Sequence, residues 1–281
     1  MKLAIFTDAR GSRIGVVEGS EIADITVAAP ELPEDMTALL ALGEDGLAKV
    51  REAVSDAPRL ALDGIRLEAP VPNPGKFLAV GLNYADHIRE IGAPTPEFPS
   101  CFAKMSTCIN GPYDPVHRPR VSDTLDYEGE LGFVIGRRCR HVPRERAQEV
   151  IAGYVVVDDF TVREWVAKTP QVVIPKSFDT HGPFGPWLVT ADEVGDPHGL
   201  TIKTWVNGEL RQMASTHEML FTIPRLIAFA SSVMTLMPGD VLLTGSPPGS
   251  SPLEPGDLVE TTIEGIGVLQ NKVEMSSSPA P

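Results

Sequence analysis

The alternation of hydrophobic and polar residues predicts many short strands and few helices. We expect three strands near the start, separated by the turn-rich segments DARGS and EGS. These are LAIF (3–6), RIGVV (13–17) and EIADIT (21–26). Apolar residues at helical spacing over residues 35–54 predict one or two amphipathic helices, and strand-like sequence returns over 58–72. The cluster PVPNPGK (70–76) is typical of a linker, so we predict a small N-terminal α+β domain over residues 1–72.

Beyond residue 76 the pattern is richer in strands. The predicted strands lie within KFLAVGL (76–82), LDYEGELGFVIG (125–136), GYVVVDD (153–159), TIKTWVNGEL (201–210) and DVLLTG (240–245). Asn207-Gly208 predicts a tight hairpin, because both turn positions need a positive φ. Helices are predicted at 143–152 and 218–235, and a flexible tail at 276–281. The whole pattern predicts a β-rich α+β protein, whose second domain (73–275) is a mixed sheet or β-roll.

Composition narrows the possible functions. The chain has 281 residues, of which 42% are hydrophobic, so it can bury a core. A formal charge of −14 argues against nucleic acid as a partner. No apolar stretch is long enough for a signal peptide or a membrane span, so we expect a cytoplasmic protein without membrane partners. The three cysteines do not form a disulfide pattern; free thiols are the expectation, with a nucleophilic cysteine as the alternative.

Two acidic segments are candidates for chemistry. If residues 125–136 form a strand, Glu128 and Glu130 point to the same face and repel each other unless a cation lies between them. The alternative is an ordinary solvated strand face. Asp158 and Asp159 end a second apolar strand, where they would otherwise be turn or cap residues. Three carboxylates from two strands would suit Mg²⁺ or Mn²⁺, and no Cys/His spacing favours zinc.

Six segments occur in a fixed order over roughly residues 76–273: GLNYADHIREIG, LDYEGELGFVIGRRCR, GYVVVDDFTVREW, PKSFDTHGPFGP, VNGELRQ and LTGSPPG. Together they resemble the fumarylacetoacetate hydrolase family. The resemblance implies a mixed β-roll, usually dimeric, which acts on small 2-oxo acids. The family includes acylpyruvases, fumarylpyruvate hydrolases, oxaloacetate decarboxylases and the isomerase/decarboxylases of aromatic-acid degradation.

The resemblance also assigns roles to residues. It implies Glu128, Glu130 and Asp159 as metal ligands for Mg²⁺ or Mn²⁺, with Lys176 beside them. Taken alone, a lysine in this segment is more typical of a solvated surface. The family pattern near the third ligand resembles N-D-V-S-A-R-D, and this chain departs from it by carrying a carboxylate at Asp158.

The remaining assignments concern catalysis and substrate. The resemblance implies His87 and Glu90 as a catalytic pair on a mobile lid, whereas the sequence alone would equally describe an exposed helical pair. Arg163 is expected to bind a substrate carboxylate, or alternatively to pair with Asp158 or Glu164. Ser246 is expected to keep a hydroxyl at the substrate.

Three functions follow from this site. The first is a divalent-metal-dependent hydrolase that cleaves a carbon–carbon bond in an acylpyruvate-like 2-oxo acid. The second is a decarboxylase or isomerase of an unsaturated 2-oxo dicarboxylate, of the oxaloacetate or 2-hydroxyhepta-2,4-diene-1,7-dioate type, which uses the same metal site. The third is a metal- or ligand-binding protein without activity.

Overall fold

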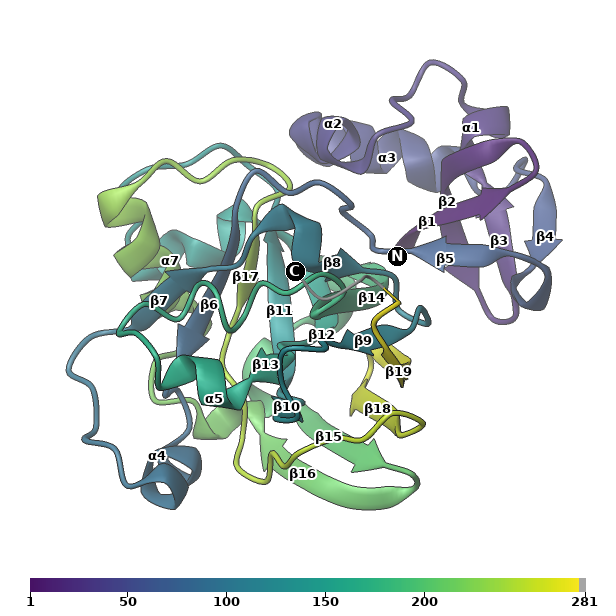
Figure 1. The fold of residues 1–281 in the computed structure, drawn as a ribbon. Helices are drawn as coiled ribbons and strands as arrows, with labels where there is room; N and C mark the ends of the chain where they lie inside the picture. The colour runs from purple at the N-terminus through teal and green to yellow at the C-terminus, as the bar shows by residue number, and fades with distance from the viewer. Residues whose placement is uncertain (278–281) are drawn as a thin grey trace.

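A computed structural model of the protein describes residues 1–277, and Figure 1 shows its arrangement. Within these residues, one continuous sheet contains twelve strands. Ten of them follow the order β4 (Arg59–Ala61), β3 (Glu21–Asp24), β2 (Gly11–Glu18), β1 (Lys2–Asp8), β14 (Gly182–Thr190), β12 (Ile151–Asp158), β11 (Gly129–Ile135), β17 (Val241–Leu243), β6 (Phe77–Gly81) and β7 (Ser100–Ala103). The other two are β5 (Arg66–Glu68), which pairs with β1, and β8 (Ile109–Asn110), which pairs with β14.

Two smaller sheets complete the β structure of the described residues. The five-stranded sheet follows the order β16 (Glu209–Ser215), β15 (Thr201–Val206), β18 (Leu258–Ile263), β19 (Gly267–Met275) and β9 (Val116–Arg118). The two-stranded sheet pairs β10 (Leu125–Asp126) with β13 (Thr161–Val162). Most neighbours are antiparallel, but β17–β6, β14–β8 and β19–β9 are parallel, which confirms the predicted mixed, β-rich architecture. Asn207 and Gly208 join β15 to β16 with φ values of 52° and 81°, as the hairpin prediction required.

Helices are short and lie around the sheets. The α-helices are α1 (Ile25–Ala28), α2 (Met36–Ala41), α3 (Gly43–Ala53), α4 (Ala85–Ile91), α5 (Arg163–Val166), α6 (Ala191–Val194) and α7 (Ile223–Val233). The 3₁₀ helices are η1 (Leu62–Gly64), η2 (Ser106–Cys108), η3 (Arg144–Val150), η4 (Pro197–Gly199) and η5 (Thr216–Glu218). Helices α2 and α3 confirm the prediction for residues 35–54.

Several predicted boundaries were wrong. The helix predicted over 143–152 is the 3₁₀ helix η3, and it stops at Val150 because the buried apolar run that follows forms β12. The helix predicted over 218–235 begins only at Ile223, where Pro224 occupies the first turn. The residues just before it are held in a loop, because the side-chain oxygen of Asn83 accepts a hydrogen bond from the backbone N–H of Phe221 at 2.7 Å.

Two predicted strands are also interrupted. Strand β3 stops at Asp24, whose buried carboxylate accepts hydrogen bonds from Arg13 Nε at 3.0 Å and from Thr26 Oγ1 at 2.6 Å, and a helical turn follows. The segment 125–136 is not one strand: β10 ends at Asp126, and β11 begins at Gly129. Glu128 therefore lies just before β11 and not within a continuous strand.

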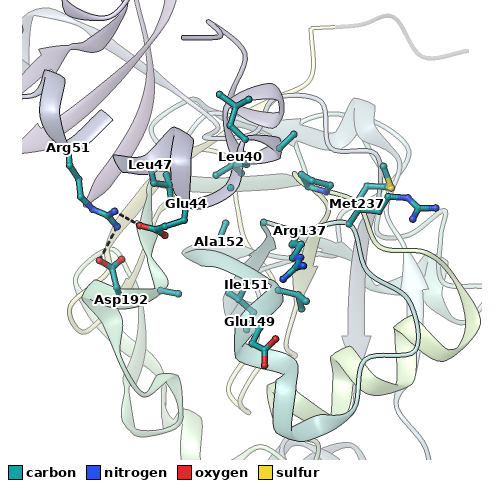
Figure 2. Close-up of a pocket in the computed structure, with 18 residues that line it drawn as sticks. Leu40, Glu44, Leu47, Arg51, Arg137, Glu149, Ile151, Ala152, Asp192 and Met237 are labelled. Atoms are coloured by element: carbon teal, nitrogen blue, oxygen red, sulfur yellow. Dashed lines mark hydrogen bonds and ion pairs between the residues drawn. The ribbon is translucent and has the colours of Figure 1, made fainter. Parts of the chain in front are cut away.

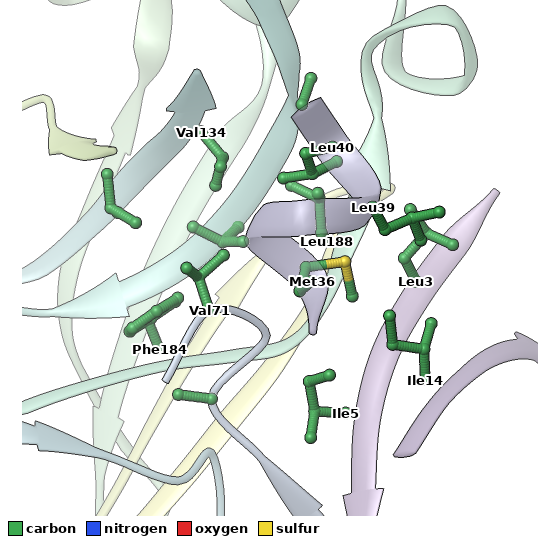
Figure 3. Close-up of a cluster of buried hydrophobic side chains, with 14 of the residues drawn as sticks. Leu3, Ile5, Ile14, Met36, Leu39, Leu40, Val71, Val134, Phe184 and Leu188 are labelled. Carbon is green, nitrogen blue, oxygen red and sulfur yellow. The ribbon is translucent and has the colours of Figure 1, made fainter. Parts of the chain in front are cut away.

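One hydrophobic core joins the N-terminal strands and helices to the larger sheet. Strand β1 pairs with β14 through Lys2↔Val189 and Leu3↔Leu188, so the purple N-terminal ribbon in Figure 1 continues the main sheet. Figure 3 shows side chains from both parts in a single buried cluster. Its labelled members are Leu3, Ile5, Ile14, Met36, Leu39, Leu40, Val71, Val134, Phe184 and Leu188. The domain boundary at residue 72 stays a prediction.

The end of the chain is partly described. The backbone N–H of Ser276 donates a hydrogen bond to the carbonyl of Arg118 at 3.0 Å, which extends the contact between β19 and β9. Residues 278–281 of the predicted flexible tail lie outside the described residues. Over residues 1–277, none of the helices combines the length and apolar character needed to cross a membrane.

Candidate active site

Three carboxylates meet at one end of the β11–β12 pair. Glu128 comes directly before β11, Asp159 comes directly after β12, and the two strands are in register through Gly129↔Asp158. Glu130 is the second residue of β11. One oxygen from each of Glu128, Glu130 and Asp159 lies within 4.8 Å of the others, and all three side chains are buried. The antiparallel pairing thus brings Asp159 to Glu128 and Glu130, from which it is 31 and 29 positions away in the sequence.

Asp158 holds the backbone at this point. Its Oδ1 accepts a hydrogen bond from the backbone N–H of Glu128 at 2.8 Å, and its Oδ2 accepts one from Thr261 Oγ1 at 3.0 Å. Burial raises the pKa of Asp158 to about 7. The carboxylate that departs from the family pattern is therefore used in hydrogen bonds outside the candidate metal cluster, one of which fixes the backbone of Glu128.

Gly129 permits the close approach of the second sheet. A Cβ at this position would lie 2.3 Å from Thr204 Oγ1 and 2.8 Å from Thr261 Cγ2. We expect Gly129→Ala to lower the free energy of unfolding by about 1–3 kcal/mol, because a well-packed interface must open to admit the methyl group. Urea denaturation would measure this. Gly64→Ala is the control, since its added Cβ meets nothing within 4 Å; equal stability of both variants would contradict the close approach.

Two lysines contact the carboxylates, as the family resemblance implied for one of them. Lys176 Nζ donates to Glu128 Oε2 at 2.5 Å and to Asp159 Oδ2 at 2.8 Å. Lys104 Nζ donates to Asp159 Oδ1 at 2.5 Å, to the carbonyl of Lys176, and to the carbonyl of His181 at 3.1 Å. Lys104 thus ties a predicted metal ligand to the segment that carries Lys176.

Arg163 pairs with different residues from those predicted. Its Nε donates to Asp126 Oδ2 at 2.8 Å and its Nη2 donates to Glu128 Oε1 at 2.6 Å. The alternative prediction, that Arg163 pairs with Asp158 or Glu164, was therefore wrong. Asp158 bonds to Glu128 N–H and Thr261, whereas strand β10 brings Asp126 next to the guanidinium of Arg163. Arg163 therefore orients Glu128. A contact with a substrate carboxylate stays a prediction.

The electrostatics of the three carboxylates are unequal. Burial alone would raise the pKa of Glu128, but the adjacent charges of Lys176 and Arg163 more than offset it and lower this pKa to about 2. Among residues 1–277, the one hydrogen-bond donor to the Glu130 carboxylate is the backbone N–H of Gly245, at 2.6 Å. Burial and repulsion from Asp159 and Glu128 hold the pKa of Glu130 well above its usual range. Glu130 is therefore the carboxylate that most lacks a compensating cation.

This set of donors fits a hard divalent cation. Carboxylate oxygens are the ligands preferred by Mg²⁺ and Mn²⁺. A cation among the three would relieve the repulsion at Glu130. The ammonium of Lys176 relieves it only partly, since of these three carboxylates it bonds to Glu128 and Asp159. Glu128, Glu130 and Asp159 are the residues that would hold the ion.

The predicted catalytic pair forms at a second place, on α4. His87 Nδ1 and Glu90 Oε2 are 3.0 Å apart, and the imidazole is almost buried. The other oxygen of Glu90, Oε1, accepts a hydrogen bond from the backbone N–H of Gly249 at 3.1 Å. Figure 1 shows α4 at the outer edge of the fold, next to the long connection that leads to β7.

A short loop after β17 links this pair to the carboxylates. The backbone N–H of Gly245, its second residue, donates to Glu130, and that of Gly249, its sixth, donates to Glu90. Ser246 lies between them with its hydroxyl bonded inside the protein, accepting from Gln212 Nε2 at 2.9 Å and donating to the carbonyl of Pro247 at 3.1 Å. The structure thus gives Ser246 a role in shaping the loop, and substrate contact by Ser246 stays a prediction.

Sequence reasoning missed two residues at this site. The side-chain oxygen of Gln212 accepts a hydrogen bond from the backbone N–H of Gly129 at 3.1 Å, and its amide nitrogen donates one to the hydroxyl of Ser246 in the loop. In the sequence, Gln212 was only the last residue of the segment VNGELRQ and had no role assigned to it. Lys104 is 3% exposed. The sequence offered one signal for Lys104, which is a single lysine among the apolar residues of CFAKM. That pattern is typical of a buried, paired ammonium, but it is equally typical of the end of a strand.

We expect Lys104→Met to destabilise the protein. The change leaves Asp159 Oδ1 and two carbonyls without their buried donor, and breaking a buried ion pair costs about 3–5 kcal/mol. Urea denaturation of the metal-free protein would measure the loss. Lys49→Met, on the exposed side of α3, should change the free energy of unfolding by less than about 0.5 kcal/mol. A Lys104→Met variant as stable as Lys49→Met would mean that the ammonium contributes nothing net.

The fold and this site define the class of the protein. A family model described as "Fumarylacetoacetate (FAA) hydrolase C-terminal" matches residues 76–274. The chain belongs to the fumarylacetoacetate hydrolase family, as the six segments implied. Its members are enzymes, and among the relatives are hydrolases, isomerases and tautomerases.

Individual relatives cover nearly the whole chain. The mitochondrial oxaloacetate tautomerase of Xenopus laevis is 39% identical, over 97% of this chain and 90% of that protein. The maleylpyruvate hydrolase of Sphingobium sp. SYK-6, solved with manganese(II) and pyruvate, is 37% identical with a TM-score of 0.87, covering 99% of this chain and 100% of that one. The 2-hydroxyhepta-2,4-diene-1,7-dioate isomerase of Mycobacterium marinum is 32% identical with a TM-score of 0.81, over 99% and 100%.

Proposed function

We propose that the protein is a divalent-metal-dependent hydrolase that cleaves a carbon–carbon bond in an acylpyruvate-like 2-oxo acid. The observation that carries this proposal is the loop from Gly245 to Gly249, which bonds at one end to Glu130 and at the other to Glu90. It connects a cation site to a paired imidazole, which are the two parts that metal-assisted hydrolysis needs. The maleylpyruvate hydrolase with bound manganese and pyruvate supports the same assignment.

The protein's own residues supply the acid–base step. With its Nδ1–H donated to Glu90, His87 has the lone pair of Nε2 left to accept a proton from water. The resulting hydroxide attacks the distal carbonyl carbon, and the bond between that carbon and the methylene carbon of the pyruvyl unit breaks. The products are a carboxylic acid and pyruvate enolate, and the enolate carbon takes up a proton to give pyruvate. The carboxylate of Glu90 stabilises the imidazolium in the interval.

Negative charge on the 2-oxo acid end of the substrate would be balanced by a bound cation and by Lys176. A bound Mg²⁺ or Mn²⁺ would act as a Lewis acid toward the carboxylate and keto oxygens of the 2-oxo acid. Burial works against the charge of Lys176, but Asp159 and Glu128 outweigh it and raise the pKa of Lys176. The ammonium therefore stays charged and can stabilise the enolate electrostatically.

The test is a product analysis. Metal-stripped protein is incubated with a panel of acylpyruvates and with oxaloacetate, with and without Mg²⁺ or Mn²⁺, and the products are resolved by mass spectrometry. Metal-dependent release of pyruvate plus a carboxylic acid is the expected result, and Glu128→Ala should abolish it. If the wild type binds neither metal, the carboxylate site is not a metal site.

A second candidate is isomerisation, tautomerisation or decarboxylation at the same site. The full-length likeness to an oxaloacetate tautomerase favours it, because moving a proton between carbon and oxygen needs His87 but no attacking water. Double-bond migration, a change in the keto–enol ratio of oxaloacetate, or release of carbon dioxide without a second acid would support this candidate over hydrolysis. The same incubations distinguish the two.

Assembly and location stay predictions. The family resemblance favours a homodimer, which a sedimentation experiment would test. The sequence favours the cytoplasm, whereas the Xenopus relative is named as mitochondrial, so the compartment must be determined directly.

A further inference from the structure

A cleft of about 850 Å³ opens between the N-terminal helices and the main sheet. Figure 2 shows α2 and α3 on one side, and the residues that follow β11 and begin β12 on the other. Pairing of Gly129 with Asp158 and of Ile135 with Ile151 places this cleft at the opposite end of β11 and β12 from the carboxylates. Six residues of strand separate the two ends, which is roughly 20 Å. The cleft is therefore distinct from the candidate active site.

The charges around the cleft are not all satisfied. Arg51 bridges its two walls, pairing with Glu44 and with Asp192 Oδ2 at 3.3 Å, as the dashed lines in Figure 2 show. Glu149 is engaged by Arg146, whose Nη2 lies 2.8 Å from Glu149 Oε2. Three acidic residues of the lining are thus already paired, each with an arginine.

Arg137 and Arg138 are different. Both line the cleft and both are exposed, yet over residues 1–277 no carboxylate lies within 4.0 Å of either guanidinium. Figure 2 shows Arg137 above Ile151 and Glu149, on the side of the cleft formed by the sheet. Glu149 lies near enough for the charge of Arg137 to help lower its pKa, but Arg146 already holds that carboxylate. In a chain with a formal charge of −14, two adjacent exposed arginines outside any close ion pair leave cationic groups free to meet a ligand.

The rest of the lining is apolar. Leu40 and Leu47 contribute from the helices, and Ile151, Ala152 and Met237 from the main sheet and the loop before β17. Pockets of this size typically bury a small organic ligand against apolar side chains, while a few polar groups fix its orientation. The planar fork of arginine matches the two oxygens of a carboxylate. A bare inorganic anion would leave the apolar walls unused.

We propose that this cleft is a second binding site, for an organic carboxylate with an apolar or aromatic body. The carboxylate pairs with Arg137 and Arg138, and the body lies against Leu47 and Ile151, between the N-terminal helices and the sheet. This inference does not depend on the proposed hydrolase activity, because none of its residues belongs to the carboxylate cluster or to the His87–Glu90 pair.

Calorimetric titration of the 281-residue chain tests the proposal. The probes are naphthalene-2-carboxylate, its uncharged analogue naphthalene-2-carboxamide, and acetate, which has the charge without the body. We expect the naphthoate to bind at least about tenfold more tightly than either of the others, because it alone uses both the arginines and the apolar walls.

Matched variants locate the binding. The double variant R137Q/R138Q should lose the preference for naphthoate over the amide, whereas Arg144→Gln should keep it, since Arg144 is exposed on η3 and outside the cleft. Thermal melting checks that both variants fold. The proposal is overturned if naphthoate does not bind, if it binds no better than the amide, or if R137Q/R138Q binds it as tightly as the wild type does, which would place the ligand elsewhere.

Discussion

Replacing Glu130 by glutamine should abolish metal binding without destabilising the metal-free protein. The amide oxygen can still accept the hydrogen bond from Gly245 N–H, while the buried repulsion from Glu128 and Asp159 disappears. The expected result is therefore an unfolding free energy equal to or above that of the wild type, together with loss of Mn²⁺ binding. Lewis-acid stabilisation is worth several kcal/mol, so turnover should fall by about 10³-fold.

Calorimetry with Mn²⁺ and urea denaturation measure the two parts of this prediction separately. Glu164→Gln is the matched control, because it removes one negative charge next to Arg163 from an exposed side chain that contacts none of the three carboxylates. It should bind Mn²⁺ as the wild type does. Retention of tight Mn²⁺ binding by Glu130→Gln would place the ion elsewhere in the protein.

The second large effect is expected at His87. If the imidazole is the base that activates water, His87→Ala should reduce the hydrolytic turnover by about 10²–10⁴-fold, the usual contribution of general acid–base catalysis. Mn²⁺ affinity should not change, because His87 belongs to α4 and not to the carboxylate cluster. Steady-state kinetics and metal titration on the same preparation would give both values.

Asp86→Asn is the control for this substitution. Asp86 lies on the same helix and pairs with Arg89 at the surface, so the change removes a charge and a helical ion pair without touching the imidazole. Its activity should stay within about twofold of the wild type, since exposed ion pairs of this kind contribute little. Full activity of His87→Ala would rule out the imidazole as the base, whichever reaction the enzyme performs.

The sequence predicted the strands and turns that depend on the local pattern of residues. Buried apolar runs identified β11 and β12, and the requirement for positive φ identified the turn at Asn207-Gly208. The carboxylates were found because each lies beside such a run. The end of η3 was missed because the spacing that favours an α-helix also fits a 3₁₀ helix, and only pairing with β11 makes Ile151 a strand residue.

Long-range pairing explains the other misses. Lys104 is held by Asp159 and by carbonyls 72 and 77 residues further on, and nothing in its own segment specifies those partners. Arg163 was matched to its neighbours in sequence, whereas β10 brings Asp126 to it from 37 residues away. Motif resemblance proposed the candidate residues of the site, but only the fold shows which of them touch.

The pairing of β1 with β14 has a consequence for attempts to shorten the protein. A chain that lacked residues 1–72 would keep the predicted catalytic segment, but the backbone of Leu188 and Val189 would become an open sheet edge. Phe184 and Leu188 would also lose the apolar side chains that cover them in Figure 3. An unpaired edge beside exposed apolar surface is a template for aggregation. We therefore expect the N-terminal region to keep the rest of the chain soluble, and truncated forms to precipitate before their activity can be assayed.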